Sequence, residues 1–441
     1  MTRSGGWGDL VRGEPGRLYV LLCLINLLNY IDRQAVTGLL EPIRVDLGAT
    51  DAQMGLVGSA FLLTYALLPP VFGWLGDRMR RTRLLASSAA AWCVATAASG
   101  LVGSVGQLAV ARAAVGIGEA SYMANTPGLI SDLFPPTRRA RALSIFYAAA
   151  PIGAALGVAI AGYIAGHFGW RVACFLVGLP GLLLVAALYR SREPARGTLD
   201  AEAAGPPPSL GEVLAQFRAK PVLIALALGF AGQVFVQNAV EYWLPTILQR
   251  DKAIPIATAN ATYGVMVFIA GIVGPLGGAI VGDWAVRRTP RGYYLVSALA
   301  IAAVAVPIGV ISVTSNPTVL FGAVLVEALL GNFATGLVMA AAMGQVGAQS
   351  RSTTAAILLT TMHLLGDFIS WPLVGSLSTA MSEGRLGTLV AAASAVGVAP
   401  EHHLTIALIG VSVPAAIVAG VMYLTAGALD RTGRPADPAG A

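Results

Sequence analysis

The chain has 441 residues, of which 56% are hydrophobic and only 11% are charged, and its formal net charge is +6. A soluble globular domain carries about 25% charged residues. This composition excludes an ordinary soluble protein and indicates an integral membrane protein. The net positive charge by itself would be compatible with nucleic-acid binding, so the positions of the basic residues have to decide that point.

Apolar segments long enough to cross a bilayer as helices recur along the whole chain. We count about twelve of them, which predicts an all-α integral membrane fold. The predicted spans are residues 18–40, 52–75, 84–103, 107–131, 142–165, 170–189, 221–244, 259–281, 292–313, 318–344, 354–380 and 404–428.

Lysine and arginine fall mostly on one side of these spans. With an internal N-terminus, the basic clusters within 78–83, 138–141, 190–220 and 287–291 are all internal. This bias predicts that both termini are cytoplasmic, and it explains the positive charge without a nucleic-acid partner. The basic residues left in the external loops are Arg44, Arg171, Arg250, Lys252 and Arg385.

A polar segment at 191–220 divides the chain. The run Pro206-Pro207-Pro208 cannot continue a helix, and it is followed by apolar residues at helical spacing between Leu210 and Phe217. We therefore predict an N-terminal six-helix bundle at 1–190, a cytoplasmic linker with a short amphipathic helix at 191–220, and a C-terminal six-helix bundle at 221–441.

The two predicted bundles share a local motif. Gly76-Asp77 follows the second span and Gly282-Asp283 follows the eighth, and in both places basic residues come next. Two parallel repeats, related by a pseudo-twofold axis along the membrane normal, would produce this correspondence.

These features resemble the major facilitator superfamily of transporters. The loop with Gly73, Asp77-Arg78 and Arg80-Arg81 resembles the superfamily's signature between helices two and three, with Arg80 in place of one expected glycine. The segment with Arg112, Gly116 and Gly118 resembles its helix-four motif associated with proton coupling. The resemblance implies the major facilitator fold and transport by alternating access.

Three short stretches resemble the Spinster family more narrowly. They are Asn29-Tyr30-x-Asp32-Arg33-Gln34, Gly116-x-Gly118-Glu119-Ala120 and His363-Leu364-Leu365-Gly366-Asp367-x-x-Ser370. In the last, Trp371 stands before Pro372 where a Ser-Pro pair is expected. The resemblance implies a bacterial homologue that moves a lysophospholipid or a sphingolipid, coupled to protons.

Four charged residues lie inside the first and fourth spans, where charges are costly and mark functional sites. They are Asp32, Arg33, Arg112 and Glu119. At a rise of about 1.5 Å per residue, they fall within one or two helical turns of each other. We predict that Asp32 and Glu119 exchange the coupled proton. The alternative is a static charge network that only locks the two helices together. The residues predicted to bind the substrate headgroup here are Arg33, Arg112, Asn29 and Tyr30.

The second half has its own polar positions. Glu327 in the tenth span occupies about the place that Glu119 holds in the fourth. His363 and Asp367 are four residues apart and share one helical face. We predict that all three contact the substrate, and the alternative is that the His–Asp pair only stabilises helix packing. Glu241, nearer the external end of the seventh span, is either a gate residue or a solvated surface residue.

A cytoplasmic gate is predicted where the shared motif meets the basic loops. Charge pairs there can close the cytoplasmic opening of the transport pathway in one state and separate in the other. The alternative for its arginines is simple topological anchoring. The predicted gate residues are Asp77, Arg78, Arg138, Arg139, Arg141 and Asp283.

Competing functions are limited by what the sequence lacks. No Gly-x-x-x-x-Gly-Lys-Ser/Thr loop is present, so ATP is not the predicted energy source. The four histidines and three cysteines do not cluster, so we predict no metal, no cofactor and no enzymatic activity. A drug exporter, an organic anion or sugar porter, and a non-transporting sensor remain as alternatives.

Short loops and a composition rich in Ala, Gly and Arg favour the bacterial inner membrane. The predicted partners are a small amphipathic substrate, protons and the lipid bilayer, with no nucleic acid, and the predicted state is a monomer.

Overall fold

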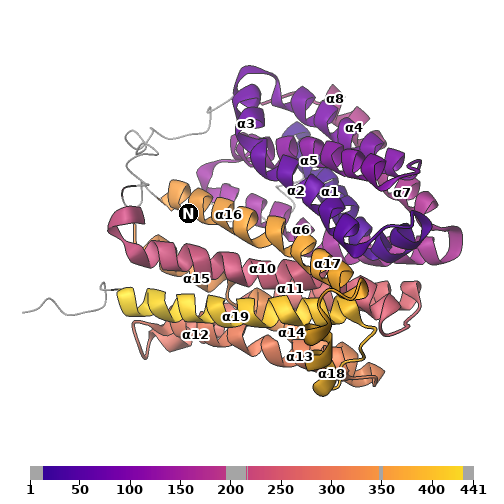
Figure 1. Cartoon of the computed structure of the whole chain (residues 1–441). Helices are drawn as coiled ribbons and strands as arrows, with labels where there is room; N and C mark the ends of the chain where they lie inside the picture. Colours follow the sequence, from indigo (N-terminus) through magenta and orange to yellow (C-terminus); the bar gives the residue numbers. More distant parts are fainter. Residues whose placement is uncertain (1–12, 195–214, 216, 347–350, 431–441) are drawn as a thin grey trace, which may run out of the picture. The chain divides into compact units, whose positions relative to one another are not determined.

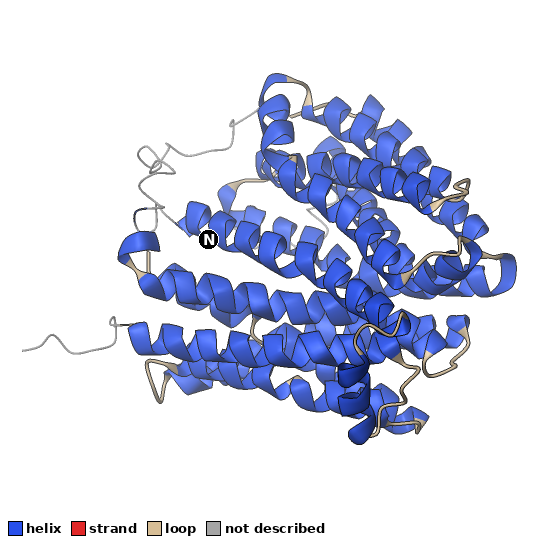
Figure 2. Cartoon of the chain, in the orientation of Figure 1, coloured by secondary structure: helices blue, strands red, loops and turns tan. Residues whose placement is uncertain are grey.

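The computed structural model describes residues 13–194, 215, 217–346 and 351–430, and every regular element in those ranges is helical (Figures 1 and 2). This confirms the predicted all-α fold. The chain forms two compact units. The first comprises Met1–Ala204 and Leu248–Phe268, and the second comprises Gly205–Ile247 and Ile269–Ala441.

The first unit contains six of the predicted spans, two of which are interrupted. The second span breaks at Leu68, before Pro69-Pro70, and the sixth breaks at Leu179-Pro180, because proline has no backbone N–H to donate to the preceding turn. The helices are α1 (Gly13–Asp46), α2 (Asp51–Leu67), α3 (Pro69–Arg78), α4 (Arg81–Ser99), α5 (Val105–Leu133), α6 (Pro136–Phe168), α7 (Trp170–Gly178) and α8 (Gly181–Arg190).

The second unit is also helical, and its eleventh predicted span contains a π-helical turn, η3 (His363–Asp367), between two α-helices. The ends of α10 and α11 that fall within Leu248–Phe268 group with the first unit. The helices are α10 (Pro221–Arg250), α11 (Ile256–Val286), α12 (Gly292–Ala303), α13 (Ala305–Val313), α14 (Pro317–Phe333), α15 (Thr335–Gly344), α16 (Arg351–Met362), α17 (Phe368–Ser382), α18 (Gly387–Ala395) and α19 (His403–Leu429).

Nine helical stretches of the described residues are long and apolar enough to cross a membrane. The other three predicted spans form α1, α4 and α5, which have 34, 19 and 29 residues. Even the shortest of them extends about 28 Å at 1.5 Å per residue, close to the thickness of the hydrocarbon core. Two of these less apolar helices, α1 and α5, carry the buried charges of the candidate site.

Glycines allow the helices of the first unit to approach closely, as in other membrane bundles. A Cβ added at Gly157 in α6 would lie 2.4 Å from the carbonyl oxygen of Ile31 in α1. A Cβ added at Gly118 in α5 would lie 2.7 Å from the carbonyl oxygen of Ser88 in α4. These two contacts hold the backbone beside Asp32 and beside Glu119, so the close packing sets where the charged side chains lie.

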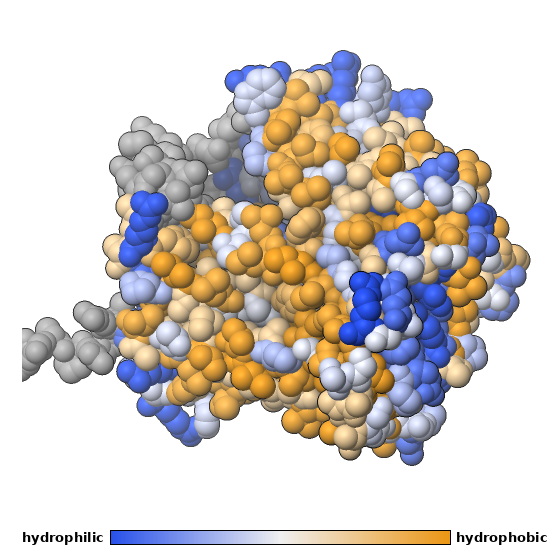
Figure 3. Space-filling model, in the orientation of Figure 1, coloured by the Kyte–Doolittle hydropathy of each residue, from blue (hydrophilic) through white to orange (hydrophobic). Residues whose placement is uncertain are grey.

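The exposed surface fits a lipid environment. On the face shown in Figure 3, apolar side chains cover most of the length of the helices, while hydrophilic side chains gather near helix ends. Large apolar residues such as Leu183, Ile280 and Leu299 are at least 70% exposed. Such a surface would be unfavourable in water and is favourable in a bilayer.

The predicted division at 1–190, 191–220 and 221–441 stays a prediction. The two units are grouped by packing, and the first unit includes Leu248–Phe268, the end of α10 and the beginning of α11. Most of the predicted linker, including all but residues 215 and 217 of its amphipathic segment between Leu210 and Phe217, lies outside the described residues.

Candidate functional site

A buried ion pair connects α1 and α5 of the first unit. The Arg33 guanidinium donates two hydrogen bonds to Glu119 Oε2, from Nε at 3.0 Å and from Nη2 at 2.7 Å. The Glu119 side chain is fully buried, whereas that of Arg33 is 19% exposed. Aromatic rings of Tyr30, Phe61 and Tyr65 surround the guanidinium, with centroids 4.2 to 5.3 Å from its central carbon. The pair therefore lies in an apolar and aromatic setting, where ionic hydrogen bonds are strong.

Asp32 does not pair with its neighbour Arg33. Its Oδ2 accepts a hydrogen bond of 2.6 Å from the Thr96 hydroxyl in α4, and its Oδ1 has no hydrogen-bond partner among the residues that the structure describes. The residue is 2% exposed. Consecutive residues on a helix point about 100° apart, so Asp32 faces α4 while Arg33 faces α5. The sequence predicted Asp32 as a proton-exchanging acid, but no sequence signal indicated Thr96 as its partner.

Arg112 completes the cluster, and it lies on the same face of α5 as Glu119. It is 3% exposed, its guanidinium lies 4.9 Å from the Phe61 ring centroid, and its Nε and Nη1 make no hydrogen bond. It lies close enough to act electrostatically on both Asp32 and Glu119. Asn29 lies beside Glu119, yet neither amide atom forms a well-aligned hydrogen bond.

The four charges are thus brought together but incompletely bonded. Within the described ranges, Asp32 and Glu119 each have one carboxylate oxygen without a hydrogen bond, and Arg112 has N–H groups without one. Buried polar groups in a static core are almost always satisfied. Two acids and two arginines with spare donors and acceptors can exchange partners when a proton or an anionic group arrives.

A second polar cluster lies in the other unit. His363 Nδ1 is 2.6 Å from Asp367 Oδ2, and Asn238 Nδ2 donates to Asp367 Oδ1 at 2.7 Å. Glu327 is 4% exposed on α14. Glu241 accepts a hydrogen bond from Gln237 at 3.2 Å and is partly buried. The sequence placed Glu241 close to the external membrane surface. In the structure its carboxylate accepts a hydrogen bond from the Gln237 amide and belongs to this cluster.

Three of the predicted gate residues, Arg78, Arg139 and Asp283, make contacts within their own units. Arg78 stacks on Trp74, Tyr293 donates a hydrogen bond of 2.9 Å to Asp283, and Arg139 donates to the carbonyls of Ser131 and Phe134. Arg138 and Arg141 are partly buried on α6. The side chain of Asp77 lies outside the described residues.

An ion-pair network that the sequence did not reveal lies near these gate positions. Arg81 donates to Asp132 at 2.5 Å and to Glu193 at 3.2 Å, and it connects α4, α5 and the segment after α8. Arg81 is 8% exposed. The partners are 51 and 112 residues away in the chain, so no local spacing signals the contact.

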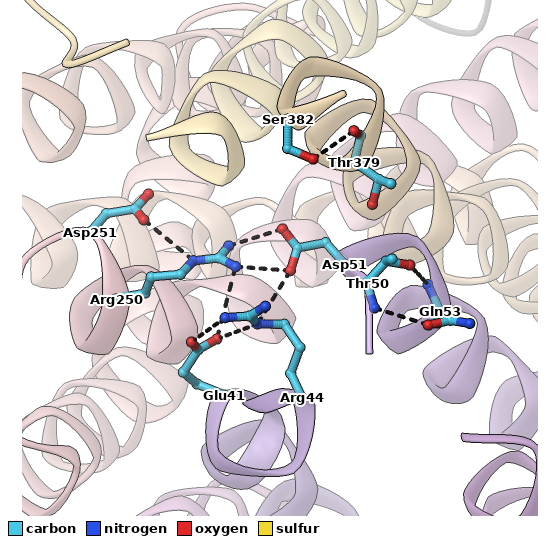
Figure 4. A network of polar contacts seen from close by, with 9 residues as sticks. All are labelled: Glu41, Arg44, Thr50, Asp51, Gln53, Arg250, Asp251, Thr379 and Ser382. Atoms are coloured by element: carbon cyan, nitrogen blue, oxygen red, sulfur yellow. Dashed lines mark hydrogen bonds and ion pairs between the residues drawn. The ribbon is translucent and has the colours of Figure 1, made fainter. Parts of the chain in front are cut away.

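A larger network that the sequence also missed lies at the opposite ends of the helices (Figure 4). Arg250, at the end of α10, donates two hydrogen bonds to Asp51, of 2.9 and 3.0 Å, and approaches Glu41 at 3.9 Å. Arg44 forms a two-bond pair with Glu41, of 2.7 and 2.9 Å, and lies 3.8 Å from Asp51. All of these residues belong to the first unit, and the network fastens Leu248–Phe268 to α1 and α2. Only the Glu41–Arg44 pair, at i,i+3, has a local sequence signal.

Comparison with known proteins identifies the family. The family profile of the Major Facilitator Superfamily matches residues 22–370. Protein spinster homolog 1 of Xenopus tropicalis is 32% identical over 400 residues, covering 83% of this chain and 74% of the relative, and the Mus musculus protein is 32% identical over 397 residues, covering 84% and 74%.

Solved structures agree with this result. A crystal structure of a bacterial homologue of the human lysosomal transporter Spinster, inward-facing and unoccupied, is 25% identical to this chain with a TM-score of 0.80. The match covers 95% of this chain and 98% of that one. A D-xylose–proton symporter shares the fold at 18% identity and a TM-score of 0.70, covering 92% of this chain and 97% of that one.

Proposed function

Since the chain belongs to the Spinster family of the major facilitator superfamily, and is therefore a membrane transporter and not an enzyme, we propose that it is a proton-coupled secondary transporter. Its proposed substrate is an amphipathic lipid of the lysophospholipid or sphingolipid type. Transport proceeds by alternating access, and the substrate and the proton are handled by the buried charges of α1 and α5.

The observation that carries the proposal is the incomplete bonding of the Asp32, Arg33, Arg112 and Glu119 cluster. Arg33 binds Glu119, while Asp32 is left with the Thr96 hydroxyl and the longer-range field of Arg112. A proton added to Glu119 removes the charge that holds Arg33, and the released guanidinium is then available to another anion. A permanently satisfied charge network would not leave these donors and acceptors open.

The substrate headgroup is assigned to the arginines. A guanidinium presents several N–H donors in a planar fork that matches a phosphate or carboxylate. Arg33 is the more exposed of the two arginines and is surrounded by Tyr30, Phe61 and Tyr65, whose rings offer an apolar surface for the adjoining part of a lipid. Asn29 adds amide groups that have no hydrogen bond in this state.

Gating is assigned to charged residues at helix ends in both units. The Arg81 and Arg250 networks join distant segments through ion pairs, which can separate and re-form between two conformations. The predicted gate residues Asp77, Arg78, Arg138, Arg139, Arg141 and Asp283 remain part of this proposal.

Flux into proteoliposomes under an imposed pH gradient tests the coupling. We expect uptake of a radiolabelled lysophospholipid by the parent chain, and a loss of the pH-driven component by at least about tenfold in Asp32→Asn and in Glu119→Gln. Glu401→Gln, which changes an exposed acid, is the matched control. If Asp32→Asn and Glu119→Gln both keep full proton-driven transport, the coupling proposal is wrong and the charges only hold the two helices together.

The same vesicles test the substrate. A panel of lysophospholipids, sugars and cationic drugs is offered under one gradient, and uptake confined to sugars or drugs would overturn the lipid assignment in favour of those porters.

Placement in a bacterial inner membrane as a monomer, with both termini inside, is proposed from the loop charges. Cysteine labelling of engineered loop positions in intact cells tests the orientation, since an impermeant reagent should reach position 385 and not position 288.

A further inference from the structure

The second unit gathers seven polar side chains from three of its helical segments. The contacts run from Asn332 to Gln237 at 3.0 Å, from Gln237 to Glu241 at 3.2 Å, and from Asn238 to Asp367 at 2.7 Å. They come from α10, from α14 and from the π-helical turn η3. The members are Gln237, Asn238, Glu241, Glu327, Asn332, His363 and Asp367.

The charge balance of this cluster is one-sided. It holds three carboxyl groups, and its sole basic member is the His363 imidazole. Among the residues of the second unit that the structure describes, no lysine or arginine lies within the apolar length of a helix, in contrast to Arg33 and Arg112 in the first unit. A neutral amide donates hydrogen bonds to a carboxylate but does not balance its charge. An acid at membrane depth is costly, so a positively charged partner is expected nearby. The second unit's lysines and arginines are Arg218, Lys220, Arg287, Arg288, Arg291, Arg351, Arg385, Arg431 and Arg434.

Glu327 is the group that points to a ligand. It is 96% buried, and it makes no hydrogen bond or ion pair with any residue that the structure describes. A Cβ built on Gly331, one turn further along α14, would lie 3.9 Å from Glu327 Oε1 and 3.8 Å from Gln237 Cγ. The carboxylate and the Gln237 side chain therefore flank the same small space over Gly331, which glycine leaves unfilled. Glu241 acts electrostatically on Glu327 from the α10 side.

Aromatic residues hold this arrangement in place. Trp371 donates a hydrogen bond of 3.0 Å to the Asn238 carbonyl, and its ring stacks on Tyr242 with centroids 4.3 Å apart. Trp243 donates to the Trp371 carbonyl at 3.2 Å. These contacts fasten α10 to α17 next to Asp367, and π-helical turns such as η3 are frequent at functional sites. Acids beside aromatic rings are the surroundings in which organic ammonium groups bind.

We propose that the cluster of Glu241, Glu327 and Asp367 binds the positively charged group of an amphipathic ligand, an ammonium or methylated ammonium, through the space over Gly331. Glu327 contributes the unpaired carboxylate, and Asn238, Gln237 and Asn332 orient the others. This inference rests on the proposed transport function. It adds a cationic group to the proposed substrate, whose anionic group is assigned to the arginines.

Equilibrium binding to the full chain in nanodiscs tests the proposal without any transport step. The probes are dodecyltrimethylammonium and dodecyldimethylamine oxide, which share chain length and similar head size but differ in net charge at pH 7.5. We expect the parent chain to bind the cation at least about tenfold more tightly, and Glu327→Gln to lose most of that preference. Asp367→Asn should reduce it by a smaller factor, and Glu401→Gln should leave it unchanged. Equal affinities in the parent chain, or a full preference in Glu327→Gln, would overturn the proposal and leave a site for a proton or a purely structural cluster.

The result is separable from the proposed function. Proton-driven lipid flux without a preference for the cation refutes the ammonium site and leaves the transporter assignment intact. A cation preference that depends on Glu327, in a chain without proton-driven flux, supports the site and refutes the coupling.

Discussion

The two units bury charge in opposite ways. The first surrounds Asp32 and Glu119 with Arg33 and Arg112, so that acids and bases are equal in number and can exchange partners. The second holds Glu241, Glu327 and Asp367 among amides and one histidine. Two units that are both helical bundles can therefore have interiors of different chemistry. The balanced cluster is suited to rearrangement, and the acidic cluster is suited to receiving a positive charge.

The largest expected effect comes from removing one partner of the balanced cluster. Arg33→Ala leaves Glu119 buried without its ion pair, and breaking a buried pair in this way costs about 3–5 kcal/mol. Thermal unfolding in detergent should show this loss. The double variant Arg33→Met with Glu119→Met should recover most of the stability, since it removes both charges. No recovery would mean that the pair is not the source of the loss.

Thr96→Val should have the next largest effect, because it removes the hydrogen bond that Asp32 receives. A hydrogen bond to a charged group contributes about 1.5–3 kcal/mol. The same unfolding measurement checks it, and Thr96→Ser, which keeps the hydroxyl, is the control. If valine and serine behave alike, the Thr96 hydroxyl does not stabilise Asp32.

Gly157→Ala tests whether close packing positions the charges of α1. The added methyl would meet the Ile31 carbonyl at 2.4 Å, and overpacking of this kind costs about 1–3 kcal/mol. Gly106→Ala in α5 adds the same methyl where nothing lies within 4 Å, so it controls for helix propensity. Equal unfolding temperatures for the two variants would show that α1 and α6 adjust without strain.

Glu327→Gln should give the smallest change in stability and the opposite sign. Neutralising a buried carboxylate that has no partner in the described part of the chain removes an unfavourable charge, so we expect stability to rise but to stay within about 1 kcal/mol of the parent. The unfolding temperature measures this. A fall as large as that of Arg33→Ala would show that Glu327 has a stabilising partner and would remove the contrast between the units.

Much of the fold follows from the sequence. Long apolar segments have to form helices in a bilayer because their backbone groups have no water to bond, and this predicts the all-α fold without knowledge of any contact. The motifs around Asp32, Glu119 and Asp367 indicated the family before any comparison. Helical spacing also placed His363 and Asp367 together, and they are paired even though the turn between them is π-helical.

The partners of the charged residues did not follow in the same way. Nothing local connects Thr96 with Asp32, Asp132 with Arg81, or Arg250 with Asp51, because the paired residues are 64, 51 and 199 positions apart. A hydropathy profile also treats Glu241 as a residue near the membrane surface, whereas its bond to Gln237 decides which cluster it joins.

Hydropathy and short motifs were sufficient to identify a helical membrane transporter of the Spinster family, and to show which acids and bases lie inside its spans. Packing between helices was needed to show that Arg33 binds Glu119 and not Asp32, and that Glu327 has no hydrogen bond or ion pair with any residue in the described ranges. The two kinds of information differ in how far along the chain the responsible interactions reach. Hydropathy and helical period act along the chain and can be read from it, whereas an ion pair depends on the rotation and close approach of helices distant in sequence, which glycines such as Gly118 and Gly157 permit.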